Sequence, residues 1–299
     1  MSSTNKAALF NKTHRVLKRT YKDVPTKYDQ TLLLESLLFA SCLENARWEV
    51  AQPAFEKLRD AFFDWNEIRV STVKELAEVL STLPEPSEAA TRVKGVLQSV
   101  FESDYSFDLE HLKKQNIGAV VKRLHKLQGA TNFNVAYATQ TALGGHSIPV
   151  DKGTLGVLVV LGAITPEEAE SGVVPGMERA IPKSKGQEFG ALLHELGAEF
   201  FATPFSPTVR ELLLSIAPDA KERFPKRGAK KAAKKSEAEV NGKKDAKRGS
   251  RKEPVATKKR TKTEKRPARA AKSASQTKKK PARTAKKTPA KALAKRKPR

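Results

Sequence analysis

The sequence predicts an all-α fold for residues 1–225, and three observations support that prediction. Apolar residues recur at spacings of three and four, helix-capping patterns precede several of these runs, and no alternating apolar pattern surrounds them that would predict a sheet. A stretch of this length is enough for one large domain or two closely packed lobes. It can therefore bury a substantial core.

The first predicted helices lie between residues 32 and 83. Residues 32–44 are apolar almost throughout, which predicts a buried helix. A second helix is predicted from one apolar face formed by Phe55, Leu58, Phe62 and Trp65. Thr72 and Glu75 then match the S/T-x-x-E capping box, which predicts the start of a third helix.

Further helices are predicted between residues 87 and 143. Ser87 is placed to cap the first of them, which extends to Phe101. A short helix at Leu109 and Leu112 follows. The next helix, which begins near residue 118, stops at the turn 127–129, and another helix comes after that turn.

The remaining helices are predicted between residues 153 and 216. Residues 153–162 suit a strand equally well by composition, but no alternating strands surround them to pair with, so we predict a buried helix. Thr165 and Glu168 flank Pro166 in a second capping pattern, which predicts a short helix. Residues 185–196 and 208–216 complete a body of about ten helices.

The segment from Lys226 to Arg299 differs from the rest of the chain in charge. It holds 31 Lys and Arg against 5 Asp and Glu, a net charge of +26 in a chain that totals +24, so residues 1–225 sum to −2. The segment has no aromatic residue and few large aliphatic ones, and it cannot bury enough apolar surface to offset the entropy of ordering. We therefore predict a domain boundary at residue 225 and a disordered basic tail after it.

The tail composition, Lys and Ala with spaced Pro and Thr or Ser, resembles the tails of linker histones and of bacterial histone-like proteins. Such a segment binds polyphosphate by releasing condensed counterions, whatever the base sequence. Double-stranded DNA is the expected partner, and the alternative is a solvating tail or a nuclear address. The predicted DNA-binding residues are the basic residues from Lys226 to Arg299, such as Lys278, Lys279, Lys280, Lys295, Arg296 and Lys297.

Composition also argues against several classes of protein. No run of about 18 apolar residues and no secretion signal occur, so we expect an intracellular protein that does not enter a membrane. A single cysteine, Cys42, cannot form an internal disulfide or hold an iron–sulfur cluster alone, and we interpret it as a buried small apolar residue. The histidines show no metal-ligand spacing, and no phosphate-binding or dinucleotide-binding loop is present, so no metal or cofactor is expected.

Residues 118–151 carry a resemblance to a known family. The chain there reads helix, LQGAT, helix and then a short loop that ends in HSIPVD. In spacing this resembles the helix-hairpin-helix DNA glycosylases of the endonuclease III type, in which a glycine hairpin, at about residues 118–143 here, is followed by a VD pair that opens the next helix. Leu127, Gly129 and the pair Val150-Asp151 fall into the same frame without a gap. The resemblance implies a two-lobed helical body that binds DNA.

The resemblance also implies particular site residues. Gly129 matches a hairpin glycine, which lets the backbone approach a DNA phosphate, whereas the second hairpin glycine is Thr131 here. The alternative is that residues 128–130 form an ordinary turn between helices. Asp151 matches the carboxylate that assists base excision, although an Asp at this place is also a good helix cap.

Two departures from the family pattern bear on activity. Bifunctional members have a lysine at the start of the second hairpin helix, and the matching residue is Phe133, so a lyase that acts through a Schiff base is not expected. The stretch after Gly197, where many members have four cysteines, has Phe200, Phe201 and Phe205, which we expect to pack there instead.

Two hypotheses remain open from the sequence. The first is a monofunctional DNA glycosylase of base-excision repair, with Asp151 in a cleft. The second is a catalytically inactive DNA-binding or nucleoid-associated protein that keeps the glycosylase fold. Both predict a monomer in the cytoplasm and nucleoid of a bacterium or the nucleus of a eukaryote. An exposed Asp151 in a pocket favours the first hypothesis, and a buried Asp151 favours the second.

Overall fold

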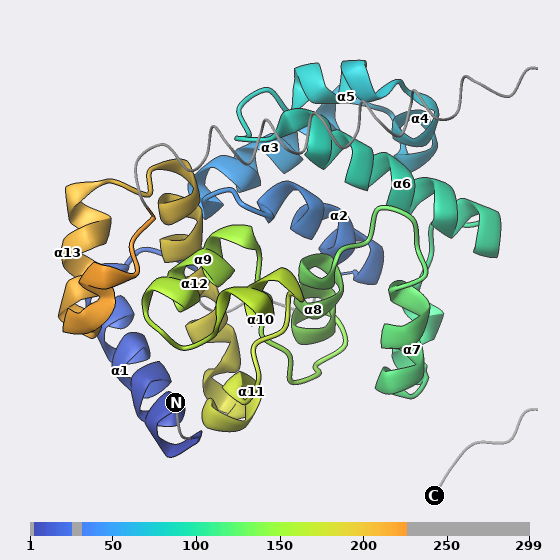
Figure 1. The fold of residues 1–299 in the computed structure, drawn as a ribbon. Coiled ribbons are helices and arrows are strands. Elements are labelled where there is room, and N and C mark those ends of the chain that lie inside the picture. Colours follow the sequence, from blue (N-terminus) through green and yellow to red (C-terminus); the bar gives the residue numbers. More distant parts are fainter. Residues whose placement is uncertain (1–2, 26–31, 226–299) are drawn as a thin grey trace, which may run out of the picture. The chain divides into compact units, whose positions relative to one another are not determined.

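The computed structural model describes residues 3–25 and 32–225, which are helical and irregular with no strand, so the predicted all-α fold is confirmed (Figure 1). The elements of this part of the chain are α1 (Ser3–Thr20), α2 (Leu33–Leu43), α3 (Trp48–Ala61), α4 (Trp65–Val70), α5 (Val73–Val79), α6 (Pro86–Asp104), η1 (Glu110–Lys114), α7 (Ile117–Leu124), α8 (Asn132–Thr141), α9 (Lys152–Val160), α10 (Pro166–Glu170), α11 (Met177–Ala180), α12 (Lys183–Ala202), α13 (Pro207–Ile216) and η2 (Pro218–Glu222).

The predicted basic tail, from Lys226 to Arg299, lies outside the described residues. The same is true of every DNA-binding residue predicted within it, namely Lys278, Lys279, Lys280, Lys295, Arg296 and Lys297. Its disorder and its contact with DNA therefore stay predictions from the sequence.

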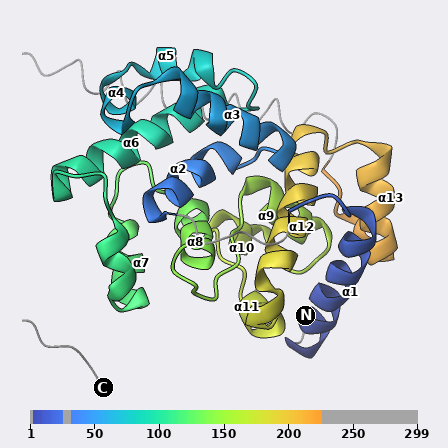
Figure 2. The same cartoon turned by 180° about the vertical axis from the view of Figure 1, so that it is seen from behind.

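The described residues pack around two apolar clusters. The first is built from α2 to α8, with α2 packed against α3, α6 and α8. The second joins α1 to the helices from α9 onward, and α1 lies against α11, α12 and α13 (Figure 2). The chain passes from the first cluster to the second between α8 and α9. Asp151 lies where the two clusters adjoin, since it contacts Asn45 after α2 and His194 of α12.

Several predicted local features are confirmed. In the capping box at α5, Glu75 N–H donates to Thr72 Oγ1 at 3.2 Å and Thr72 N–H donates to the Glu75 carboxylate at 2.8 Å. The same reciprocal pair, Thr165 and Glu168, opens α10. Residues 152–160 form helix α9, and Cys42 is buried within α2.

The predicted single helix through Phe55 and Trp65 is wrong. Helix α3 ends at Ala61, and Phe62 is extended with φ −131° and ψ 147°. The side chain of Asp64 then accepts a hydrogen bond from Glu67 N–H at 2.8 Å and starts α4. This local cap favours a new helix start over continuation, because it satisfies a backbone donor that a helix leaves free at its first turn.

Other element ends also differ from the predictions. Helix α6 begins at Pro86, so Ser87 lies in its first turn and does not cap it. Sequence patterns did not predict α1, whose Phe10 and Leu17 are buried in the second cluster. Phe200 is buried as expected, whereas Phe205 is 41% exposed and does not fill the space after Gly197.

Helices α9 and α12 cross on glycines. A Cβ added to Gly153 would lie 2.2 Å from the carbonyl oxygen of Gly197, and a Cβ added to Gly197 would lie 2.6 Å from the backbone nitrogen of Thr154. Neither backbone atom has room to move within a packed helix. The crossing brings His194 of α12 to the first residues of α9.

We expect Gly153→Ala to lower the free energy of unfolding by about 2 kcal/mol, because the added methyl group overpacks this crossing. Chemical denaturation measures the change. Gly118→Ala in α7 is the control, since its nearest neighbour is the side-chain oxygen of Asn116 at 3.2 Å. Equal effects of the two substitutions would contradict the close α9–α12 packing.

Candidate functional site

The helical hairpin is formed by α7, a seven-residue turn at 125–131 and α8. Asn116 caps α7 by accepting hydrogen bonds from Gly118 N–H at 2.9 Å and Ala119 N–H at 3.3 Å. Thr131 caps α8 by accepting from Asn134 N–H at 3.1 Å. Polar residues at these two positions thus define the starts of both helices.

Gly129 is required by the packing of this turn. Its φ is +81°, and a Cβ at this position would lie 2.5 Å from the carbonyl oxygen of Arg92 in α6. Gly95, one turn later in α6, meets Gln128 in the same close contact. The side of Gly129 where a Cβ would project therefore faces α6, and any approach of DNA has to use another side of the turn.

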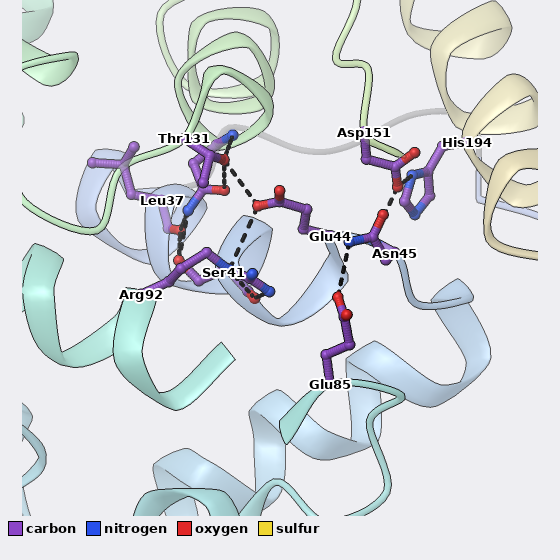
Figure 3. Close-up of polar contacts among 10 residues, drawn as sticks. Leu37, Ser41, Glu44, Asn45, Glu85, Arg92, Thr131, Asp151 and His194 are labelled. Carbon is purple, nitrogen blue, oxygen red and sulfur yellow. Dashed lines mark hydrogen bonds and ion pairs between the residues drawn. The ribbon is translucent and has the colours of Figure 1, made fainter. Parts of the chain in front are cut away.

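The Asp151 carboxylate caps α9 and is enclosed by donors (Figure 3). Its Oδ1 accepts from Thr154 N–H at 2.8 Å, and its Oδ2 accepts from Asn45 N–H at 3.0 Å. His194 Nδ1 lies 3.1 Å from Oδ2, within ion-pair distance. The Asp151 side chain has no exposed surface. Both of its oxygens are thus engaged within the protein.

The surroundings of His194 favour its protonated form. Nε2 lies 2.9 Å from the carbonyl oxygen of Ala46, which can only accept, and Nδ1 faces the carboxylate of Asp151. Burial alone would lower the pKa of His194, but the Asp151 charge and these contacts outweigh it, so the pKa is raised. For Asp151, burial would raise the pKa, and the His194 charge with the donated hydrogen bonds lowers it instead.

A second polar cluster connects α2 to the hairpin and to α6. The Glu44 carboxylate accepts from Thr131 Oγ1 at 2.9 Å and lies 3.5 Å from Arg92 Nε (Figure 3). Burial raises the pKa of Glu44, and the nearby charge of Asp151 acts in the same direction. The Thr131 hydroxyl, at the position where the resemblance places a second hairpin glycine, is therefore occupied by protein contacts.

Apolar side chains fill the space beside Asp151 and His194. Phe133, where the resemblance places a lysine in bifunctional enzymes, is 2% exposed and its ring centroid lies 5.1 Å from that of His194. Phe133 and Tyr137 line a cavity of about 10 Å³ next to His194. That volume holds about one water molecule. A nucleobase does not fit there in this conformation.

Exposed lysines on the hairpin were not predicted as site residues. Lys122 and Lys126 are exposed, and neither forms an ion pair with a residue that the structure describes. Lys122 and Lys126 stand four residues apart, on the same side of α7 and the turn that follows. That spacing in KRLHK was the signal available in the sequence.

Two further residues lie close to Asp151 in the sequence, and neither contributes to the enclosed carboxylate. His146 Nε2 lies 2.8 Å and 3.0 Å from the carbonyl oxygens of Glu178 and Ile181, so it holds the loop before α9 against α11. Lys152 is exposed at the first position of α9. Among the described residues no group of three or more His, Cys, Asp or Glu is arranged to hold a metal, and none of their helices is long and apolar enough to cross a membrane.

No protein-family model and no curated protein matches the chain in sequence. Solved structures do match, and the fold is similar to that of endonuclease III. A non-covalent endonuclease III–DNA complex matches over 76% of this chain and 100% of its own, with 16% identity and a TM-score of 0.51. A trapped endonuclease III–DNA covalent intermediate matches over 75% of this chain and 100% of its own, with 14% identity and a TM-score of 0.48. A thermostable thymine-DNA glycosylase matches over 69% of this chain and 91% of its own, with 16% identity and a TM-score of 0.47.

The resemblance seen in the sequence is therefore confirmed at the level of the fold. The chain has too few cysteines to hold a four-cysteine iron–sulfur cluster by itself. Its only cysteine is Cys42, which is buried in α2. Four thiolates are needed to hold such a cluster.

Proposed function

We propose that this protein binds double-stranded DNA with a glycosylase-type body and a basic tail, without excising bases. The observation that carries the proposal is the enclosure of Asp151. A carboxylate that assists excision has to lie beside the sugar of a flipped nucleotide, where it stabilises the positive charge that develops there. Asp151 instead stabilises the protein, as the cap of α9 and the partner of a protonated His194.

The neighbouring residues support the same proposal. Phe133 provides no amine for a Schiff base, and its buried ring packs beside His194. The alternative, a monofunctional glycosylase, requires α2, α8 and α12 to separate around Asp151 when DNA binds. That motion would break the contacts of Asp151 with His194, Thr154 N–H and Asn45 N–H.

DNA contact is expected at two places. The tail provides most of the positive charge and binds without regard to sequence. The exposed Lys122 and Lys126 offer a smaller second contact on the hairpin, where they orient the body on the duplex. A protein of this kind suits a role in chromatin or nucleoid organisation, or in recognition of altered DNA.

We test the hairpin contact with the full-length double variant Lys122→Ala, Lys126→Ala. Loss of two phosphate contacts should reduce the slope of log affinity against log salt by about 2 units. Fluorescence anisotropy with a labelled duplex measures the slope. The control is Lys57→Ala, Lys74→Ala, which removes the same charge from exposed positions on α3 and α5. Indistinguishable slopes for the two variants would exclude the hairpin as a DNA contact.

A further inference from the structure

A cavity of about 310 Å³ lies at the turn between α3 and α4, outside the site described above. Three aromatic side chains line it, Phe62, Phe63 and Trp65, and we call it the α3–α4 pocket. The Phe63 side chain is 96% exposed, which is unusual for a large apolar residue. Trp65 is held in place because it stacks on Phe55 with the ring centroids 6.4 Å apart. The pocket thus has one aromatic ring fixed by packing, Trp65, and one exposed ring, Phe63.

Carboxylates surround these aromatic rings. Glu35 and Asp64 line the pocket, and the one cation in its lining, Arg59, lies 3.8 Å from Glu35. A neighbouring cavity of about 210 Å³ shares Glu35 and Arg59 and adds the exposed Glu56. The lining as a whole is therefore acidic.

Aromatic faces next to carboxylates form a site for an organic cation. The negative face of each ring attracts an ammonium or guanidinium group, and the carboxylates add charge attraction. A lysine side chain also provides a methylene stem that packs against the rings. The ligand class that this pocket fits is a lysine in a basic peptide segment.

We propose that the α3–α4 pocket binds a lysine side chain from residues 226–299 of a second copy of the chain. The copy carries the complementary charge, since those residues sum to +26 and residues 1–225 sum to −2. Such a contact is heterologous, and it links copies either by reciprocal exchange of tails in a pair or head to tail in a row. Copies that lie side by side on a duplex would then bind cooperatively.

A mixed-label NMR experiment detects the contact between copies. One copy is labelled with ¹⁵N, and the other is unlabelled and carries a nitroxide on Ser275→Cys. Cys42 stays unmodified, because burial raises the pKa of its thiol to about 12. At low salt we expect selective loss of signal intensity at the amides of Phe63 and Trp65, and recovery at high salt.

Matched variants test whether the pocket itself is responsible. Phe63→Ala with Glu35→Gln in the ¹⁵N-labelled copy should abolish the intensity loss. Tyr105→Ala with Glu102→Gln, which changes another exposed aromatic residue and carboxylate on and beside α6, should leave it unchanged. The proposal is overturned if the mixed sample shows no intensity loss at the pocket amides, or if the pocket variant still shows that loss. It is also overturned if the intensity loss appears only when the ¹⁵N label and the nitroxide are in the same molecule. None of these readouts depends on base excision or on DNA affinity.

Discussion

Removal of residues 226–299 should weaken binding to undamaged duplex DNA by orders of magnitude at low salt. The segment holds 31 of the 57 basic residues, and residues 1–225 have no excess of positive charge. Each phosphate that the tail neutralises contributes about −0.9 to the slope of log affinity against log salt. Even ten such contacts would account for a slope of about −9.

The measurement is that slope for the full-length and the truncated protein. We expect the truncated protein to keep its melting temperature, because the tail has no aromatic and few large aliphatic residues to pack on the body. A slope that hardly changes on truncation would show that the tail is not the DNA anchor. A large fall in melting temperature would contradict a domain boundary at residue 225.

Asp151→Asn should lower the free energy of unfolding by about 3 kcal/mol, since it leaves a buried His194 without its counter-charge. An Asn side chain keeps part of the capping ability at α9, so the loss comes mainly from the ion pair. Asp64→Asn is the matched control: it makes the same chemical change at the exposed cap of α4 and should alter stability by less than about 0.5 kcal/mol. Equal losses at the two caps would contradict a special role for the Asp151–His194 pair.

The same ion pair predicts a particular pH dependence of stability. Because the pKa of His194 is raised in the folded protein, His194 contributes fully to stability below its pKa in the unfolded chain, about 6.5. This stability is lost as pH rises through the pKa in the folded protein. Because the pKa of Asp151 is lowered in the folded protein, Asp151 contributes to stability above its pKa in the unfolded chain, about 3.9. This stability is lost as pH falls through the pKa in the folded protein. Stability should therefore decline above about pH 6.5 in the wild type. Urea denaturation across this range should show a much smaller decline in Asp151→Asn.

The local features of the sequence predicted most of the fold. The capping boxes at Thr72 and Thr165 and the apolar run of α9 depend on neighbours within a few residues, and each was predicted correctly. The break at Phe62 was missed because the apolar spacing continues through it, although α3 ends at Ala61 and Asp64 caps the start of α4. Helix α1 was missed as well, and its buried residues pack on helices that follow it by more than 130 residues.

The chemistry of the site was less accessible from the sequence. Sequence spacing placed Asp151 at a helix start, but its main partners, His194 and the N–H of Asn45, are 43 and 106 residues away in the chain. Nothing in the sequence indicated that His194 of α12 would approach it. The approach depends on Gly153 and Gly197, whose missing side chains let α9 and α12 cross closely.

The central claim is DNA binding without base excision, and single-turnover excision on duplex DNA tests it most directly. The full-length protein is incubated in excess over duplexes that contain alkylated, oxidised, deaminated or mismatched bases, and abasic sites are revealed by alkali. Borohydride is added in parallel to trap any Schiff base. We predict binding to every duplex, no abasic product and no trapped adduct. Excision of any of these bases by the wild type, lost in Asp151→Asn under conditions where that variant is folded, would contradict the account.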